Sequence, residues 1–357
     1  MSKEVFFIPS SEQEGNQSLS EKTKRVFQEL NFSQHIEKKS FVALKIHFGE
    51  KGNKGYIKPW WLTDTIQMIK KKTNRVFFTD TNTLYVGKRS NAADHMMLAH
   101  GHGFDSQKMG VPVIIADGLI GRNNDDIRIE KQRIKWAKIA SLFIDSDVLV
   151  CLSHFTGHAL TGFGAAIKNL GMGCASRAGK LDQHSDVHPR VNPEYCNLCR
   201  TCFDFCPEQA IEEKDGKAFI VSEKCIGCGE CMVVCPLGAV KITWDSDNIR
   251  IQEKMAEYAF AVSEIFKEKI VHINFLIHVT KDCDCMCKGA PPFTEDIGIL
   301  ASYDSVALDQ ACVDMVNDQM GKDALRDQNG IDWSVQLRHG EKIGLGSRNY
   351  KIIKIEM

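Results

Sequence analysis

The sequence lacks the features that mark membrane, secreted and nucleic-acid-binding proteins. No apolar run in its 357 residues approaches the ~18 residues that a membrane-spanning helix needs. The first ten residues, MSKEVFFIPS, contain no basic stretch, long apolar core or small-residue cleavage site of the kind found in signal peptides. Basic and acidic residues balance at 45 against 46, so no positive excess favours a nucleic-acid partner. We therefore expect a cytoplasmic protein that binds neither membrane nor nucleic acid.

Cysteine, in contrast, is abundant, with 14 residues. In a chain without a secretory signal, this number favours metal ligation in a reducing compartment over a disulfide framework. Eight of the cysteines lie between Cys196 and Cys235, in two copies of one pattern that are offset by 29 residues. Each copy reads Cys-x-x-Cys-x-x-Cys-x-x-x-Cys-Pro. The segment is therefore a short internal duplication.

This spacing is typical of 4Fe–4S ligation rather than of zinc, whose sites usually use two separated Cys-x-x-Cys pairs. Three close thiolates can wrap three irons of one cubane, and the fourth starts a short helix that points to the other cluster. We expect one cluster to be bound by Cys196, Cys199, Cys202 and Cys235, and the other by Cys225, Cys228, Cys231 and Cys206. Residues 188–243 resemble a bacterial two-cluster ferredoxin.

The flanking regions predict an α/β fold. Nearly continuous apolar runs predict strands at residues 4–9, 41–47, 75–80, 111–117, 147–153, 272–279 and 296–302. Helices are expected at residues 17–38, 59–72, 91–100, 131–143, 161–169, 248–268 and 304–320. Such alternation predicts a mostly parallel sheet with helices on both faces. We expect one α/β domain, formed by residues 1–187 and 244–357, interrupted by an α+β two-cluster ferredoxin-like module at 188–243.

Polar residues follow several of these strands, and in parallel sheets ligands bind outside the carboxyl ends of the strands. His47, Asp80, Asp117 and His154 stand at such positions, and Asp304 follows the last predicted strand. Several groups of this kind at one edge predict a polar pocket, which can hold a metal.

The strand at 272–279 leads into the run Cys283-Asp284-Cys285-Met286-Cys287. In an extended segment, alternation would place the three sulfurs on one side. With Cys174, Cys312 or a histidine, they could form a third metal centre, either a cluster or a zinc site; the alternative is a set of free thiols in an irregular loop.

Residues 157–179 are rich in glycine. The glycines could let the backbone approach an anionic ligand, with Lys168 or Arg177 supplying positive charge. The alternative is a loop that packs tightly under the inserted module.

Several strings together resemble one family: KIHFGEKGN, FTDTNTLYVGKRSNAADHMMLAHGHGF, SHFTGHALTGFGAAIKNLGMG, SRAGKLDQHSDVHP and DIGILASYDSVALDQACVD. It is the family of iron–sulfur-centre proteins of anaerobic bacteria and archaea that carry the domain of unknown function numbered 362. The resemblance runs from His47 to about Asp314 and implies the fold arrangement and iron–sulfur binding, without a particular substrate. The matching polar positions are His47, Asp80, Asn82, His95, His154, Lys168, Asn169, Cys283 and Cys285.

These observations predict an iron–sulfur redox protein that takes electrons from a soluble carrier. As an enzyme, it would be a ferredoxin-linked oxidoreductase. The electrons would pass to the polar site, where the substrate is a small molecule or a protein. We expect His47, Asp80 and His154 to act as acid/base or metal groups there, Lys168 to bind an anion, and Cys283, Cys285 and Cys287 to be candidate metal ligands. The alternative is a non-catalytic electron carrier or a metallocentre-assembly partner that docks on a larger redox enzyme.

Overall fold

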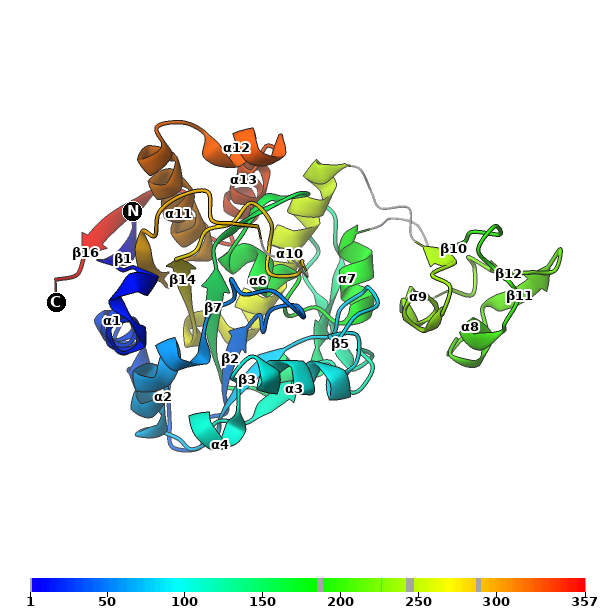
Figure 1. Cartoon of the computed structure of the whole chain (residues 1–357), viewed down its shortest axis with the longest axis horizontal. Coiled ribbons are helices and arrows are strands. Elements are labelled where there is room, and N and C mark those ends of the chain that lie inside the picture. Colours follow the sequence, from blue (N-terminus) through cyan, green and yellow to red (C-terminus); the bar gives the residue numbers. More distant parts are fainter. Residues whose placement is uncertain (1, 185–188, 226, 242–246, 287–289, 357) are drawn as a thin grey trace.

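The computed structural model of the chain describes residues 2–184, 189–225, 227–241, 247–286 and 290–356. Its central element is an eight-stranded sheet (Figure 1). In spatial order the strands are β16 (Tyr350–Lys354), β1 (Lys3–Pro9), β15 (Gly298–Ser302), β14 (Ile270–Leu276), β7 (Val148–His154), β2 (Val42–Ile46), β3 (Val76–Asp80) and β4 (Val113–Ile115). Seven strands run in one direction, and β15 pairs antiparallel with both of its neighbours. The predicted mostly parallel α/β sheet is confirmed.

Both faces of the sheet are covered because its central strands are apolar on both sides. In β7, Val148, Val150 and Leu152 belong to one core, whereas Leu149 and Cys151 belong to the other. The first core is packed by α1 (Asn16–Glu29), α2 (Thr63–Lys70) and α3 (Ala92–Gly101). The second is packed by α6 (Ala166–Gly171), α10 (Asn248–Phe266), α11 (Ser305–Met320) and α13 (Ser334–Ile343). Cys151 is thus a free cysteine inside the apolar core.

Some elements differ from the prediction. The segment expected as a helix at 131–143 forms β6 (Trp136–Ala140) and the short α5 (Ser141–Ile144), and β6 pairs with β5 (Asn124–Arg128). Exposure alternates along β6, from Trp136 outside to Ala137 inside, which is the pattern of a strand. The remaining elements of the domain are α4 (Ser106–Met109), β8 (Thr156–His158), β9 (Gly162–Gly164), α7 (Arg177–His184), α12 (Ala324–Asn329) and four 3-10 turns at Glu12–Glu14, Phe32–His35, Pro59–Leu62 and Lys267–Lys269.

The reversed direction of β15 changes the position of one predicted site residue. Asp304 follows β15, so it lies at the end of the sheet opposite to the carboxyl ends of the parallel strands. There it accepts hydrogen bonds from the backbone N–H groups of Val306 and Ala307 and caps α11. The prediction that Asp304 joins the polar pocket is wrong.

The cysteine-rich insert forms a small lobe beside the α/β domain (Figure 1). Its strands are β10 (Arg190–Val191) paired with β13 (Val240–Lys241), and β11 (Ile211–Lys214) paired with β12 (Lys217–Ile220). Its helices are α8 (Thr201–Asp204) and α9 (Glu230–Val234). The predicted boundaries at 188 and 243 fall on residues outside the described ones. Among the helices that the structure describes, none is both long and apolar enough to span a bilayer.

Candidate functional site

A cavity of about 430 Å³ opens at the carboxyl edge of the sheet. Its lining includes His47, Asp80, His154 and Lys168, the four residues that the sequence predicts for the site. His47 follows β2, Asp80 ends β3 and His154 ends β7, whereas Lys168 comes from α6. Because β2 lies between β3 and β7, the ends of these strands meet at one place. The structure thus brings the four side chains together; their catalytic roles stay a prediction.

Asp80 lies in a buried network with a strand lysine. Lys45 is fully buried, and its Nζ lies 2.9 Å from Asp80 Oδ1 and donates to Asn169 Oδ1 at 2.7 Å. Burial would raise the pKa of Asp80, but the charge of Lys45, with His47 and other neighbours, holds it far below its ordinary value. Asp80 therefore stays ionised near neutral pH.

His47 faces a buried arginine. Its Nδ1 accepts the N–H of Gly49 at 3.0 Å, and Arg89 Nη1 lies 2.7 Å from its Nε2. The Nε of Arg89 also donates to Glu50 Oε2 at 3.1 Å. Burial, reinforced by the positive charge of Arg89, lowers the pKa of His47 well below its ordinary value. His47 is thus a neutral imidazole at the pocket wall.

His154 connects the end of β7 to the cysteine loop. One ring nitrogen, Nδ1, lies 2.8 Å from Asp284 Oδ2, and Nε2 lies 2.8 Å from the carbonyl oxygen of Ile277. Burial alone would lower the pKa of His154, but the carboxylate of Asp284 and these hydrogen bonds raise it. Since both nitrogens are engaged, the arrangement fits a group that positions the loop.

Two lysines supply positive charge to the cavity. Lys180, on α7, donates to Thr81 Oγ1 at 2.5 Å and to the carbonyl oxygen of Ala175 at 2.6 Å. Lys168 makes no ion pair within the part of the chain that the structure describes. Burial, with the charge of Arg89, lowers the pKa of Lys168 to about 8, and burial lowers that of Lys180 to about 8. The ammonium groups of both lysines can attract an anionic ligand.

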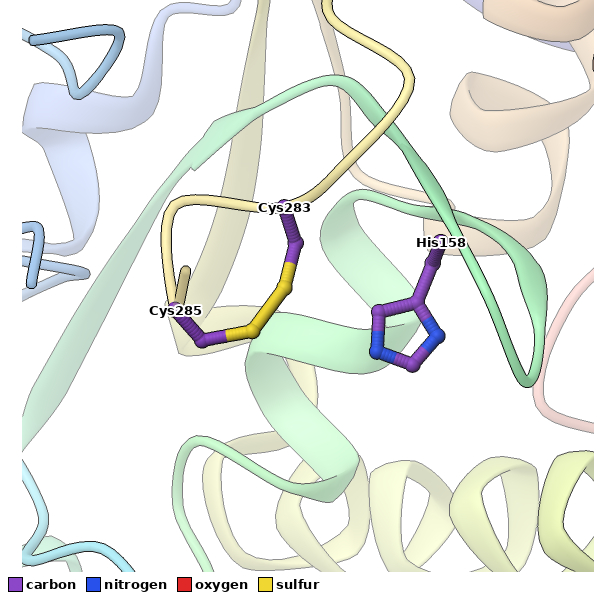
Figure 2. Close-up of side chains that lie close together, drawn as sticks. All are labelled: His158, Cys283 and Cys285. Atoms are coloured by element: carbon purple, nitrogen blue, oxygen red, sulfur yellow. A yellow bond between two sulfur atoms is a disulfide. The ribbon is translucent and has the colours of Figure 1, made fainter. Parts of the chain in front are cut away.

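The cysteine loop also lines this cavity. Cys283 and Cys285 are joined by a disulfide bond (Figure 2), whereas the sequence predicts metal-ligating thiolates at these positions. Cys287 lies outside the described residues. Cys312, one of the expected additional ligands, lies elsewhere, with its sulfur 3.4 Å from Asn274 Nδ2. The nearby imidazole is that of His158.

The eight cysteines of the insert line two small cavities, four in each. The first is lined by Cys206, Cys225, Cys228 and Cys231, and the second by Cys196, Cys199, Cys202 and Cys235. In each group, three cysteines come from one motif and the fourth from the other motif. This grouping of the thiols coincides with the ligand sets that the spacing predicts, while ligation itself stays a prediction.

The two motifs also share their backbone geometry. Cys206 Sγ and Cys235 Sγ each accept a hydrogen bond, from the N–H of Ala210 and of Ala239, at 3.2 Å. Such N–H···S bonds tune the potential of a cluster. The backbone is left-handed at Leu198 and Arg200, and again 29 positions later at Gly227 and Gly229. A set of eight thiols with repeated loop geometry and N–H donors at sulfur fits two clusters.

The insert packs against the α/β domain through a buried ion pair. Arg177, on α7, lies 2.5 Å from Glu230, the first residue of α9, and their side chains are 1% and 2% exposed. Arg177 also donates to the carbonyl oxygens of Thr83 and Ser90. Arg177 therefore contacts the insert and is not among the residues that line the cavity, whereas Lys168 of the same glycine-rich segment does line it.

An apolar contact continues from this ion pair to the cavity. Leu84 and Leu181 are buried together, and Met232, the residue after Cys231, packs against them. Leu84 also lines the cavity. The set of four cysteines formed by Cys206, Cys225, Cys228 and Cys231 therefore lies beside the α/β domain. The motif that supplies three of them also contains Glu230 and Met232.

Sequence reasoning missed Lys45, Arg89 and Glu230 as site residues. Lys45 gave a signal, because a charged residue inside the apolar run FVALKIH requires a buried partner. Arg89 and Glu230 gave none, since their partners are distant in the sequence. The remaining family positions, Asn82 and His95, are buried beside the site, and Asn82 donates to Asp117 Oδ1 at 2.8 Å.

Together, the fold and the site describe a mostly parallel α/β domain that carries a ferredoxin-like insert with two groups of four cysteines. The chain belongs to the family described as Domain of unknown function (DUF362), whose family model matches residues 42–314.

Curated relatives match over short stretches. An uncharacterized ferredoxin, MJ0265, of Methanocaldococcus jannaschii is 44% identical over 50 residues, which are 13% of this chain and 30% of that protein. The electron transport protein HydN of Escherichia coli K12 is 39% identical over 57 residues, or 15% of this chain and 33% of HydN. The indolepyruvate oxidoreductase subunit IorA of Methanothermobacter marburgensis is 44% identical over 52 residues, or 15% and 8%. The chain thus spans a third or less of the length of these relatives.

Among solved structures, the lactate racemase apoprotein of Thermoanaerobacterium thermosaccharolyticum aligns with a TM-score of 0.43 and 11% identity, over 89% of this chain and 57% of that chain. A likeness at this level carries no argument about chemistry.

Proposed function

We propose that this protein is an iron–sulfur oxidoreductase that relays electrons from a soluble carrier to the cavity at the carboxyl edge of its sheet. The ligands would be Cys196, Cys199, Cys202 and Cys235 for one 4Fe–4S cluster, and Cys225, Cys228, Cys231 and Cys206 for the other. The clusters would supply one-electron transfer at low potential. Ferredoxin and electron transport protein are the names of two relatives, which supports this class of function.

One observation carries the proposal. Leu84 lines the cavity and also packs with Met232, directly after the cysteine motif on the near side of the insert. The second motif is therefore adjacent to the cavity, and we propose that the first motif receives electrons from a soluble partner. A cavity of about 430 Å³ with lysines and neutral histidines is suited to bind and protonate a small anionic substrate. Thiolate-ligated clusters need a reducing compartment, and we propose the cytoplasm.

The roles of the cavity residues follow from their contacts. Lys168 would bind an anionic group and deliver a proton, because its pKa of about 8 lets it exchange protons near neutral pH. Asp80 would hold Lys45 and Arg89 in place, and His154 would hold the loop that carries Cys283 and Cys285. His47 would face the substrate as a neutral hydrogen-bonding group.

Electron paramagnetic resonance of the anaerobic, dithionite-reduced protein tests the ligand sets. Wild-type protein should contain about eight irons and give two coupled signals. Cys199→Ser and Cys228→Ser should each remove the signal of a different cluster, and the buried Cys312→Ala variant should keep both. Survival of both signals in Cys199→Ser and in Cys228→Ser would refute the assignment.

Reoxidation of the reduced protein distinguishes an enzyme from a carrier. An oxidoreductase should be reoxidised by the small-molecule fraction of a cell extract, and Lys168→Met should slow this reaction at least tenfold with both signals retained. A non-catalytic carrier or metallocentre-assembly partner would be reoxidised by the protein fraction alone.

A further inference from the structure

Three metal-binding side chains from two distant segments meet at the cavity. His158 ends β8, whereas Cys283 and Cys285 lie in the loop after β14. One nitrogen of His158 and the two sulfurs lie within 4.8 Å of one another. Figure 2 shows one edge of the imidazole turned towards the pair of sulfurs. Two sulfurs and one imidazole nitrogen form a donor set that binds borderline-soft divalent ions such as zinc.

The surroundings of His158 fix the orientation of its ring. Its Nδ1 accepts hydrogen bonds from the backbone N–H groups of Leu160 and Thr161, both at 3.2 Å, and lies 2.9 Å from Thr161 Oγ1. The hydroxyl of Thr161 donates to the carbonyl oxygen of Phe163 at 2.7 Å. Because Nδ1 accepts, the neutral ring carries its proton on Nε2, which makes no hydrogen bond within the described part of the chain. Binding of a metal ion at Nε2 therefore has to move this proton to Nδ1, beside Thr161 Oγ1.

The cysteine loop is fixed independently of its sulfurs. The side-chain Oδ2 of Asp284 lies 2.8 Å from His154 Nδ1. The backbone carbonyl oxygen of Asp284 accepts a hydrogen bond from the N–H of Glu50 at 2.9 Å. The carbonyl oxygen of Cys283 accepts the N–H of Met286 at 3.0 Å. With Asp284 held on one side, Cys283 and Cys285 share the other, where His158 lies. The loop is therefore shaped before any bond to sulfur forms.

We propose that, once the disulfide is reduced, His158, Cys283 and Cys285 bind one divalent transition metal ion with a coordination position open to the cavity. Reduction consumes two electrons and two protons and converts the S–S bond into two thiols. The reduced clusters supply the electrons, one each, so the inference rests on the proposed function at this step. Metal binding then releases one proton from each thiol. Three protein ligands with an open position are typical of catalytic sites.

Cobalt(II) is a suitable probe, because thiolate-to-cobalt charge transfer is visible in the absorption spectrum. The full chain with intact clusters is reduced anaerobically with dithionite, incubated with cobalt(II), desalted and analysed for cobalt and iron. Wild-type protein should bind one cobalt per chain and show the charge-transfer bands. The Cys283→Ser/Cys285→Ser double variant should lose both the bands and the cobalt. His158→Ala should bind cobalt at least tenfold more weakly, and the exposed His100→Ala should match wild type.

Iron content and resonance signals report folding and the clusters in every variant. A wild-type protein without the bands, or a His158→Ala variant with wild-type affinity, would overturn the metal site, while two intact cluster signals would leave the proposed function standing. Cobalt binding in a protein that shows no cluster signals would support the metal site and contradict the relay.

Discussion

Lys168 and Lys45 show how the same side chain takes two roles in one cavity. Lys45 is buried against Asp80, and this ion pair balances its charge. Lys168 makes no ion pair among the described residues, and burial lowers its pKa to about 8 from the ~10.4 of an unfolded chain. Between these values the unfolded chain binds more protons than the folded one, so stability rises with pH across this window.

Replacing Lys168 by Met should therefore stabilise the protein at pH 7, by roughly 1–3 kcal/mol, because the substitution removes a buried and unpaired charge. The variant should also lose part of the rise in stability between about pH 8 and pH 10; the part due to Lys180 should remain. Urea unfolding of anaerobic protein at pH 7 and pH 10 measures both effects. Lys38→Met, at an exposed position, is the control. Equal pH dependence in Lys168→Met and wild type would contradict this prediction.

At the scale of elements, the contact between α7 and α9 joins the insert to the α/β domain. The Arg177–Glu230 pair is almost fully buried, whereas the Arg200–Glu213 pair within the insert has side chains that are 59% and 47% exposed. Removing one partner of a buried pair leaves the other charge without compensation, which costs about 3–5 kcal/mol. An exposed pair contributes about 0–1 kcal/mol.

Arg177→Met and Glu230→Gln should each destabilise the packing of the insert by this larger amount, and the double variant by less than their sum. Arg200→Met and Glu213→Gln serve as the matched exposed pair and should change stability by about 1 kcal/mol or less. Double-mutant cycles from chemical unfolding give the two coupling energies. A coupling in the buried pair no larger than in the exposed pair would show that α9 does not depend on Arg177.

The elements also show what local sequence can predict. Strands β1, β2, β3, β7 and β14 follow apolar runs, and those runs are visible without any knowledge of partners. A helix is predicted at 131–143 but a strand forms there, because its strand character depends on pairing with β5. The 29-residue repeat likewise predicts the same backbone conformation in the two cysteine loops. Left-handed backbone indeed occurs at Leu198 and Arg200 in the first loop and at Gly227 and Gly229 in the second.

At the scale of the whole molecule, the two lobes differ in what holds them together. The α/β domain has two large apolar cores, one on each face of its sheet. The apolar cluster of the insert has six buried residues among those described, and two of them are cysteines; the set is Cys202, Ile211, Ala218, Ile220, Cys231 and Val240. A core of this size is too small to stabilise a lobe without cross-links or metal.

Anaerobic removal of iron with a chelator should therefore unfold the insert and leave the α/β domain folded. Hydrogen exchange followed by mass spectrometry should show loss of protection in β11 and β12, whereas β7 and β14 should keep theirs. Re-addition of iron and sulfide should restore protection. If β11 and β12 stay protected in iron-free protein, the insert is stable without its clusters.

The sequence by itself determined the eight cysteines, their grouping into two motifs and the alternation of strands and helices, because spacing and periodicity are local properties of the chain. It also placed His47, Asp80 and His154 at strand ends, which a parallel sheet brings together. Only the tertiary structure decided that β15 runs backwards and removes Asp304 from the cavity, and that Arg177 pairs with Glu230. The meeting of His158 with Cys283 and Cys285 also depends on contacts between distant segments, which strand order and packing create and no local pattern records.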